Sequence, residues 1–175
     1  MFLTGKRLFL RPPVAEDAAA LAAINGDAEV MRHFVTPQTR EESDAMLARI
    51  MAHHAEHGFG FWTVERKGQP GLIGLVGLSH VGFEAGFTPA VEIGWRIAPA
   101  HQRQGYAEEA ARMALAAGFG PLGLREIVAW TIPANETSWR LMERLGMAQD
   151  GEFEHPKVPE GHPKRRHVLY RISAA

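Results

Sequence analysis

The chain has 175 residues, of which 46% are hydrophobic and 22% charged, a balance typical of an ordinary globular protein. The net charge is −1 and the only basic cluster is the short run 164–166, which argues against nucleic acid as a partner. Cysteine is absent, which excludes disulfides, thiolate metal sites and a cysteine nucleophile. The sequence shows neither a membrane-length apolar run nor the apolar core of a signal peptide. We therefore expect one domain, residues 1–175, in the cytoplasm and without a membrane partner.

Patterns in the first half of the chain predict a strand, two helices and two further strands. Thr39 and Glu42 have the spacing of a capping box, which marks the start of the second helix, and glycine ends both helices. A turn of Gly, Pro, Gln and Lys at 67–71 separates the two later strands. The expected elements are, in order, 6–11, 16–26, 39–58, 59–65 and 72–78.

The second half alternates strands with helices and then ends in two strands. Gly146 follows the second helix of this half, where a C′ glycine is favoured. The expected strands are 91–98, 126–131, 147–154 and 166–172, and the expected helices are 105–119 and 135–145. With no internal repeat and no linker, the pattern predicts one α+β domain with a mixed sheet.

The loop between strand 91–98 and the following helix contains small residues, Gly105 and Ala107, among polar ones. Amides at a helix start have no intrahelical partner and carry partial positive charge, so such a loop suits a phosphate. On this stretch alone, an ordinary strand-to-helix connection with a left-handed glycine is the favoured interpretation. The loop matches neither a Walker motif nor a dinucleotide-binding turn.

Several motifs, taken in order, resemble the GNAT superfamily of acetyl-CoA-dependent N-acetyltransferases. Gln102-x-x-Gly105-x-Ala107 is similar to its pyrophosphate loop, strand 91–97 to its fourth strand, and Asn135-x-x-Ser138 to its Asn-x-x-Ser helix. The segments 7–11 and 167–171 resemble the RimJ/RimL-like subgroup, which acetylates the N-termini of ribosomal proteins. The resemblance implies a mixed, mostly antiparallel twisted sheet of about six to seven strands with helices on both faces.

The resemblance also implies where the co-substrate acetyl-CoA binds. The pantetheine arm would pair with the fourth strand, and its pyrophosphate would rest on the loop amides. The implied contact residues are Trp95, Arg96, Ile97, Gln102, Arg103, Gln104, Gly105, Tyr106, Ala107, Asn135 and Ser138. Asn135 is equally suited to cap the helix that follows, and both roles can coexist.

Two residues are candidates for proton transfer. Glu92 shares a strand face with Gly94 and Arg96, and the resemblance favours a base over an exposed or ion-paired carboxylate. Ser138 is either a surface serine or, as the resemblance implies, the acid beside the coenzyme sulfur. Many relatives carry a tyrosine four residues further on, where this chain has Met142.

Other features leave alternatives open. His53 and His57 share a helix face at a spacing that suits a metal, but no third ligand is evident, so no metal is expected. The segment 31–34 falls where the family shapes the acceptor site. The predicted activity is acetyl transfer to a primary amine, favouring a protein or peptide α-amine over a small amine such as an antibiotic or a polyamine. A non-catalytic acyl-CoA-binding module and a homodimer remain alternatives.

Overall fold

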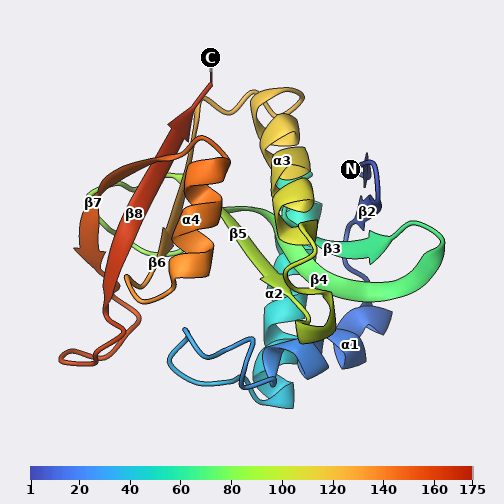
Figure 1. The fold of residues 1–175 in the computed structure, drawn as a ribbon, viewed down its shortest axis with the longest axis horizontal. Helices are drawn as coiled ribbons and strands as arrows, with labels where there is room; N and C mark the ends of the chain where they lie inside the picture. The colour runs from blue at the N-terminus through green and yellow to red at the C-terminus, as the bar shows by residue number, and fades with distance from the viewer. Residues whose placement is uncertain (175) are drawn as a thin grey trace.

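The computed structural model describes residues 1–174, which form an eight-stranded sheet and four α-helices (Figure 1). The helices are α1 (Ala18–Asn25), α2 (Arg40–His57), α3 (Tyr106–Phe119) and α4 (Glu136–Arg144). The strands are β1 (Leu3–Thr4), β2 (Leu8–Arg11), β3 (Phe61–Arg66), β4 (Gln69–His80), β5 (Val91–Ile97), β6 (Glu126–Thr131), β7 (Ala148–Glu154) and β8 (Arg166–Ser173).

Every helix and strand expected from the sequence is present, and only the ends differ by a few residues. The predicted capping box at α2 is confirmed: the Glu42 N–H donates to Thr39 Oγ1 at 3.2 Å, and the Thr39 N–H donates to Glu42 Oε2 at 2.8 Å. The expected number of strands was wrong. Strand β1 is an additional element of only two residues, too short to show an alternating pattern.

The order of strands in the sheet is β1-β2-β3-β4-β5-β6-β8-β7. All neighbours are antiparallel except β5 and β6, which confirms a mixed, mostly antiparallel sheet. The parallel pair meets only at Glu92 and Val128. Beyond Glu92 the two strands diverge toward the start of α3, so β5 retains only β4 as its neighbour within the described residues (Figure 1).

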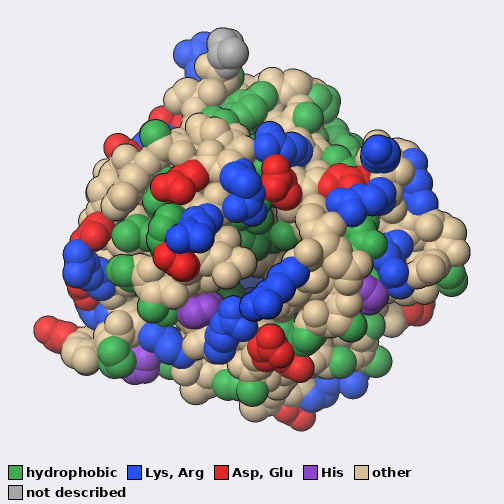
Figure 2. Space-filling view, viewed as in Figure 1, with side chains coloured by type: hydrophobic (Ala, Val, Ile, Leu, Met, Phe, Trp, Pro, Cys, Tyr) green, Lys and Arg blue, Asp and Glu red, His purple; other side chains and the backbone are tan. Residues whose placement is uncertain are grey.

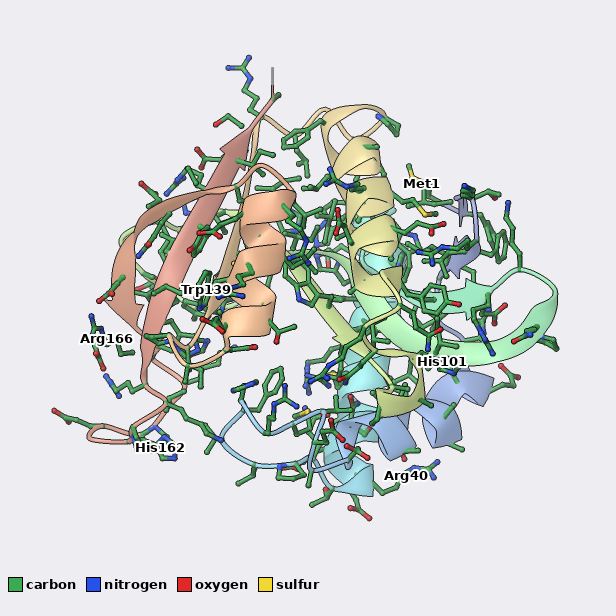
Figure 3. The ribbon with its side chains drawn as sticks, viewed as in Figure 1. Met1, Arg40, His101, Trp139, His162 and Arg166 are labelled. Carbon is green, nitrogen blue, oxygen red and sulfur yellow. The ribbon has the colours of Figure 1, made fainter. Side chains whose placement is uncertain are left out.

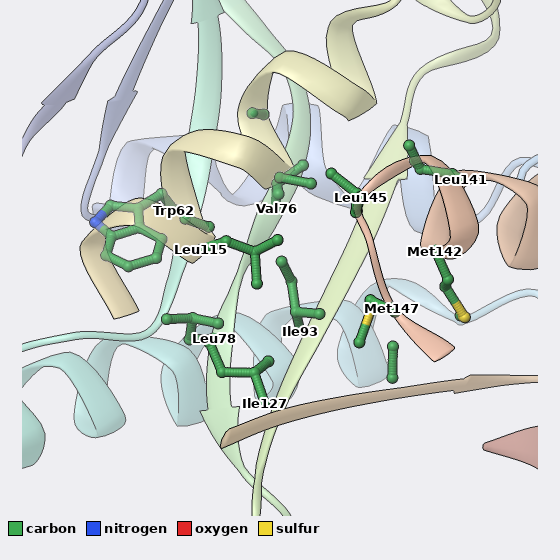
Figure 4. Close-up of a cluster of buried hydrophobic side chains, with 14 of the residues drawn as sticks. Trp62, Val76, Leu78, Ile93, Leu115, Ile127, Leu141, Met142, Leu145 and Met147 are labelled. Carbon is green, nitrogen blue, oxygen red and sulfur yellow. The ribbon is translucent and has the colours of Figure 1, made fainter. Parts of the chain in front are cut away.

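Helices cover both faces of the sheet, as expected. On one face, the alanines of α3 allow the helix to approach the sheet closely, and Leu115 packs near Val76, Leu78, Ile93 and Ile127 (Figure 4). On the other face, Leu21 of α1 and Leu47 of α2 pack against Leu75 of β4.

This alternation determines which side chains of β5 face α1 and α2. The register places Arg96 opposite Leu75, Gly94 opposite Gly77, and Glu92 opposite Ser79. Glu92, Gly94 and Arg96 therefore lie on the α1–α2 face of the sheet, because residues two apart on a strand share a face.

Candidate active site

A pocket of about 820 Å³ opens where β5 and β6 separate. Its walls come from β5, the start of α3, α4, the α1–α2 connection and the β7–β8 connection. Figure 2 shows the hollow in the middle of this face, with Lys and Arg side chains along its rim. The predicted site residues that line it are Glu92, Trp95, Arg96, Ile97, Gln102, Arg103, Gly105, Tyr106, Ala107, Asn135 and Ser138. Gln104 is the predicted residue that does not line it.

The loop before α3 presents unpaired backbone amides. Gly105 is the N-cap of α3 and has a φ of 77°, and Arg103 has a φ of 58°, so both adopt the left-handed conformation. Within residues 1–174, the N–H groups of 103–107 have no backbone or side-chain acceptor. These donors, together with the positive end of the helix dipole, form a suitable environment for an anion.

Side chains hold this loop in shape. Gln102 Nε2 donates to the Ile97 carbonyl at 3.0 Å, and Gln104 Nε2 donates to the Ala100 carbonyl at 3.0 Å. Arg7 reaches over from the β1–β2 connection and donates to the Gln104 carbonyl at 2.8 Å. Sequence reasoning did not identify this role of Arg7.

The two acids in the first turn of α3 are both paired with arginines. Glu109 binds Arg7 at 2.7 Å, on the side away from the pocket. Glu108 lines the pocket but pairs with Arg112 at 2.8 Å and with Arg144 at 3.0 Å. Because each carboxylate has a cationic partner, neither leaves an uncompensated negative charge at the anion loop.

Glu92 occupies the last point at which β5 is joined to β6. Burial raises the pKa of its carboxyl group from 4.5 to about 7, because removal from water disfavours the charged form, and the nearby Lys157 charge opposes this shift. At neutral pH the carboxyl group is therefore present in both forms, which is the condition suited to proton transfer.

Helix α4 brings Asn135 and Ser138 to the pocket. The prediction that the Asn135 side chain caps α4 was wrong: Asn135 is at the N-cap position, but Nδ2 donates to Thr131 Oγ1 at 2.9 Å. Met142 is buried in the core (Figure 4), which leaves Ser138 with the hydroxyl nearest that position on α4. The Trp139 indole donates to the Pro133 carbonyl at 3.1 Å, and its ring lies outside the pocket lining (Figure 3).

The α1–α2 connection covers the part of the pocket next to Arg96. Lys164, from the β7–β8 connection, donates to the Arg32 carbonyl at 2.8 Å and to the Phe34 carbonyl. The Arg96 guanidinium lies 4.7 Å from the centre of the Phe34 ring. These contacts hold together two connections that are far apart in the sequence.

Trp130 and His155 line the pocket within an aromatic cluster that includes Phe83 and Phe153. Burial among these rings, together with the nearby charges of His167 and Lys157, lowers the pKa of His155 to about 4. His155 is therefore neutral at physiological pH.

The expectation that His53 and His57 lack a third partner was wrong. His80, at the end of β4, completes a cluster in which one ligand atom from each ring lies within 4.8 Å of the others. His53 Nε2 is 3.1 Å from His80 Nδ1, and His53 Nδ1 is 2.8 Å from the Phe59 carbonyl oxygen. The hairpin of β3 and β4 returns His80 to α2, which helix spacing alone does not reveal.

The described residues contain no helix long and apolar enough to span a membrane.

The site combines an anion-binding loop, a gap between two strands and a carboxyl group that titrates near neutrality, features suited to acyl transfer from a phosphate-bearing donor. The chain belongs to the acetyltransferase (GNAT) family, whose domain matches residues 7–148. It is therefore an N-acetyltransferase, and this family uses acetyl-CoA.

Two curated relatives illustrate the range of the family. The chain is 32% identical to the uncharacterized N-acetyltransferase YnaD of Bacillus subtilis, covering 98% of this chain and 96% of the relative. It is 30% identical to the spermidine N(1)-acetyltransferase of Escherichia coli, covering 83% and 75% respectively.

Solved structures share the fold. A GNAT-family acetyltransferase from Bacillus anthracis is 28% identical with a TM-score of 0.81, covering 99% of this chain and 98% of that one. RimJ of Mycobacterium smegmatis, in complex with CoA-disulfide, is 22% identical with a TM-score of 0.76, covering 99% and 88%. The expected resemblance to RimJ/RimL-like enzymes is thus confirmed in the fold.

Proposed function

We propose that the protein transfers the acetyl group of acetyl-CoA to the α-amino group of a peptide or protein by direct attack. The observation that carries this proposal is the placement of Glu92, with its pKa of about 7, in the same pocket as the unpaired amides of the 103–107 loop. Acetyl-CoA supplies an activated acetyl thioester. Residues Trp95, Arg96 and Ile97 hold its pantetheine arm, and the loop amides hold its pyrophosphate.

Glu92 acts as the base in this proposal. A free α-amine has a pKa of about 7.7–8.0, whereas the pKa of lysine is about 10.4, so the α-amine loses its proton far more readily. A carboxylate with a pKa of about 7 accepts this proton, directly or through water, as the nitrogen bonds to the carbonyl carbon. Ser138 donates a proton to the sulfur as the carbon–sulfur bond breaks.

The alternative acceptor, a polyamine, is suggested by the spermidine acetyltransferase relative. The charges of the pocket disfavour it, because Arg49, Arg96, Lys157 and Lys164 all line the pocket. A polycation would be repelled by this lining.

Thiol release with acetyl-CoA and a panel of amines tests the proposal. The panel consists of peptides with a free N-terminus, the same peptides with a blocked N-terminus and one lysine, and spermidine. Rapid release only with free N-termini, and a pH profile that loses its limb near pH 7 in Glu92→Gln, would support it. Coenzyme A binding without turnover of any amine would instead indicate the non-catalytic module.

A further inference from the structure

We propose that the acceptor peptide carries a carboxylate group that Arg96 and Lys164 bind, so that the enzyme selects acidic N-terminal segments. This inference rests on the proposed function and adds a substrate class to it. It concerns the part of the pocket that α1, α2 and their connection cover, beside the gap between β5 and β6.

Arg96 is a cation without an anionic partner among the described residues. Its Nη1 donates to Asn25 Oδ1, and its guanidinium lies over the Phe34 ring. Its Nε is buried without a hydrogen-bond partner. No acidic side chain among residues 1–174 forms an ion pair with it. Arg96 nevertheless lines the pocket, on the same strand face as Glu92.

An enclosed guanidinium without a counter-ion is unfavourable, because desolvation of the charge is not repaid by attraction. Burial accordingly lowers the pKa of Arg96 to about 10. The neutral Asn25 oxygen satisfies one donor only, and the Asn25 amide is itself bound to Ser43 Oγ at 2.8 Å. A carboxylate that entered the pocket would supply the missing acceptor and would form a charge-assisted hydrogen bond with Arg96.

The other charges nearby have the same sign. Lys164 binds only backbone carbonyls, and Lys157 lies over the Phe83 ring at 5.8 Å, so neither forms an ion pair with an acid within the described residues, although the Lys157 charge acts on Glu92. Of the acids that line this end, Glu29 lies 3.6 Å from Arg32, and Glu92 is only partly ionised at neutral pH. The acceptor end of the pocket is therefore net positive.

Spacing limits where the carboxylate sits on the acceptor. Glu92 and Arg96 are four residues apart on one strand, which is about 13 Å at the usual rise per residue. This distance is longer than the distance between the amino group and the carboxylate of a single amino acid. The distance is suited to a peptide whose acidic side chain lies one to three residues after the reacting N-terminal residue.

Tetrapeptide amides with a free N-terminus test this inference. One peptide carries Asp or Glu at the second and third positions, a matched peptide carries Asn or Gln there, and a third carries Lys. We expect kcat/KM to be at least about tenfold higher for the acidic peptide than for its amide match, and the ratio to shrink as salt is added.

Arg96→Gln should reduce the acidic-to-neutral ratio toward one. The ratio, and not the absolute rate, is the readout, because Arg96 also belongs to the strand proposed to hold the pantetheine arm. Arg40→Gln, an exposed arginine of α2 outside the pocket (Figure 3), is the control and should keep the ratio. If Arg96→Gln does not fold, Lys164→Gln takes its place and should likewise lower the acidic-to-neutral ratio of kcat/KM. The decrease of that ratio with added salt in the native protein is a further test.

Equal rates with acidic and neutral peptides would overturn the carboxylate site but leave α-amine acetylation standing. A preference for the Lys peptide or for spermidine would overturn the carboxylate site as well. Turnover of no peptide at all would overturn the proposed function itself.

Discussion

At Glu92, the burial that raises the pKa of the carboxyl group also destabilises the folded chain. The pKa is about 7 in the folded protein and 4.5 when unperturbed, so the folded state favours the protonated form. Ionisation of Glu92 therefore reduces stability as pH rises from about 4.5, and the loss is complete above about pH 7.

Glu92→Gln should consequently be more stable than the native protein at pH 8, by at most on the order of 3 kcal/mol at about 1.36 kcal/mol per pKa unit. The advantage should diminish as pH falls and vanish below about pH 4, where the native carboxyl group is mostly protonated in both states. Thermal melts at several pH values, with the exposed Glu160→Gln as control, measure this. A lower melting temperature for Glu92→Gln at pH 8 would mean that the carboxylate has a structural role.

Ser138 supports a second prediction at this scale, because Met142 is buried where many relatives carry a tyrosine. If Ser138 is the acid, Ser138→Ala should lower kcat by about 10²–10⁴-fold, the usual contribution of general acid–base catalysis. Ser138→Thr, which keeps the hydroxyl, is the matched control and should retain most of the activity. A loss smaller than threefold in Ser138→Ala would show that solvent protonates the thiolate.

At the scale of elements, the loop before α3 owes its shape to glycine. A Cβ atom at Gly105 would lie 3.3 Å from Arg7 Nη2, and its φ of 77° disfavours branched side chains. Valine there would strain the loop, so asparagine, which tolerates the left-handed region, is a cleaner probe.

Gly105→Asn should weaken coenzyme A binding measured by calorimetry, because its side chain occupies space beside the free amides. Gly123→Asn is the matched control, since Gly123 also has a positive φ, of 63°, and lies outside the pocket with no atom near its Cβ position. Equal affinity in both variants and in the native protein would exclude the loop from the coenzyme site.

Local patterns predicted the elements but not the contacts between distant ones. The capping box at Thr39 and the glycine after α4, with a φ of 88°, are signals contained within a few residues, and the structure confirms both. The role of Arg7 at the Gln104 carbonyl and the contact of Lys164 with the α1–α2 connection depend on tertiary folding. No spacing in the sequence indicates them. The raised pKa of Glu92 likewise depends on its burial in the folded protein, which the residues around it in the sequence do not reveal.

At the scale of the whole molecule, buried histidines make the stability of the folded protein sensitive to acid. Desolvation lowers the pKa of His54, His155 and His167 below the usual 6.5, and that of His155 reaches about 4. The unfolded chain binds these protons more readily than the folded chain. The contribution of these neutral histidines to the free energy of unfolding is therefore complete above about pH 6.5 and is lost as pH falls toward 4.

His155→Gln should reduce this acid-induced loss, which thermal melts between pH 7 and pH 4.5 can measure. His162→Gln, in the same β7–β8 connection but outside the aromatic cluster, is the matched control. Identical acid sensitivity in the native protein and His155→Gln would assign the effect to other groups.

The divergence of β5 from β6 has a consequence for the sequence of events in each turnover. The pocket is open toward the gap between the strands. In the proposed binding mode, one wall of the peptide site is therefore missing until a pantetheine chain lies in this gap. We expect an obligatory order of addition, with acetyl-CoA first and the peptide second. Calorimetry should then detect peptide binding only when coenzyme A is present, and a peptide that bound equally well to the free enzyme would point to random order.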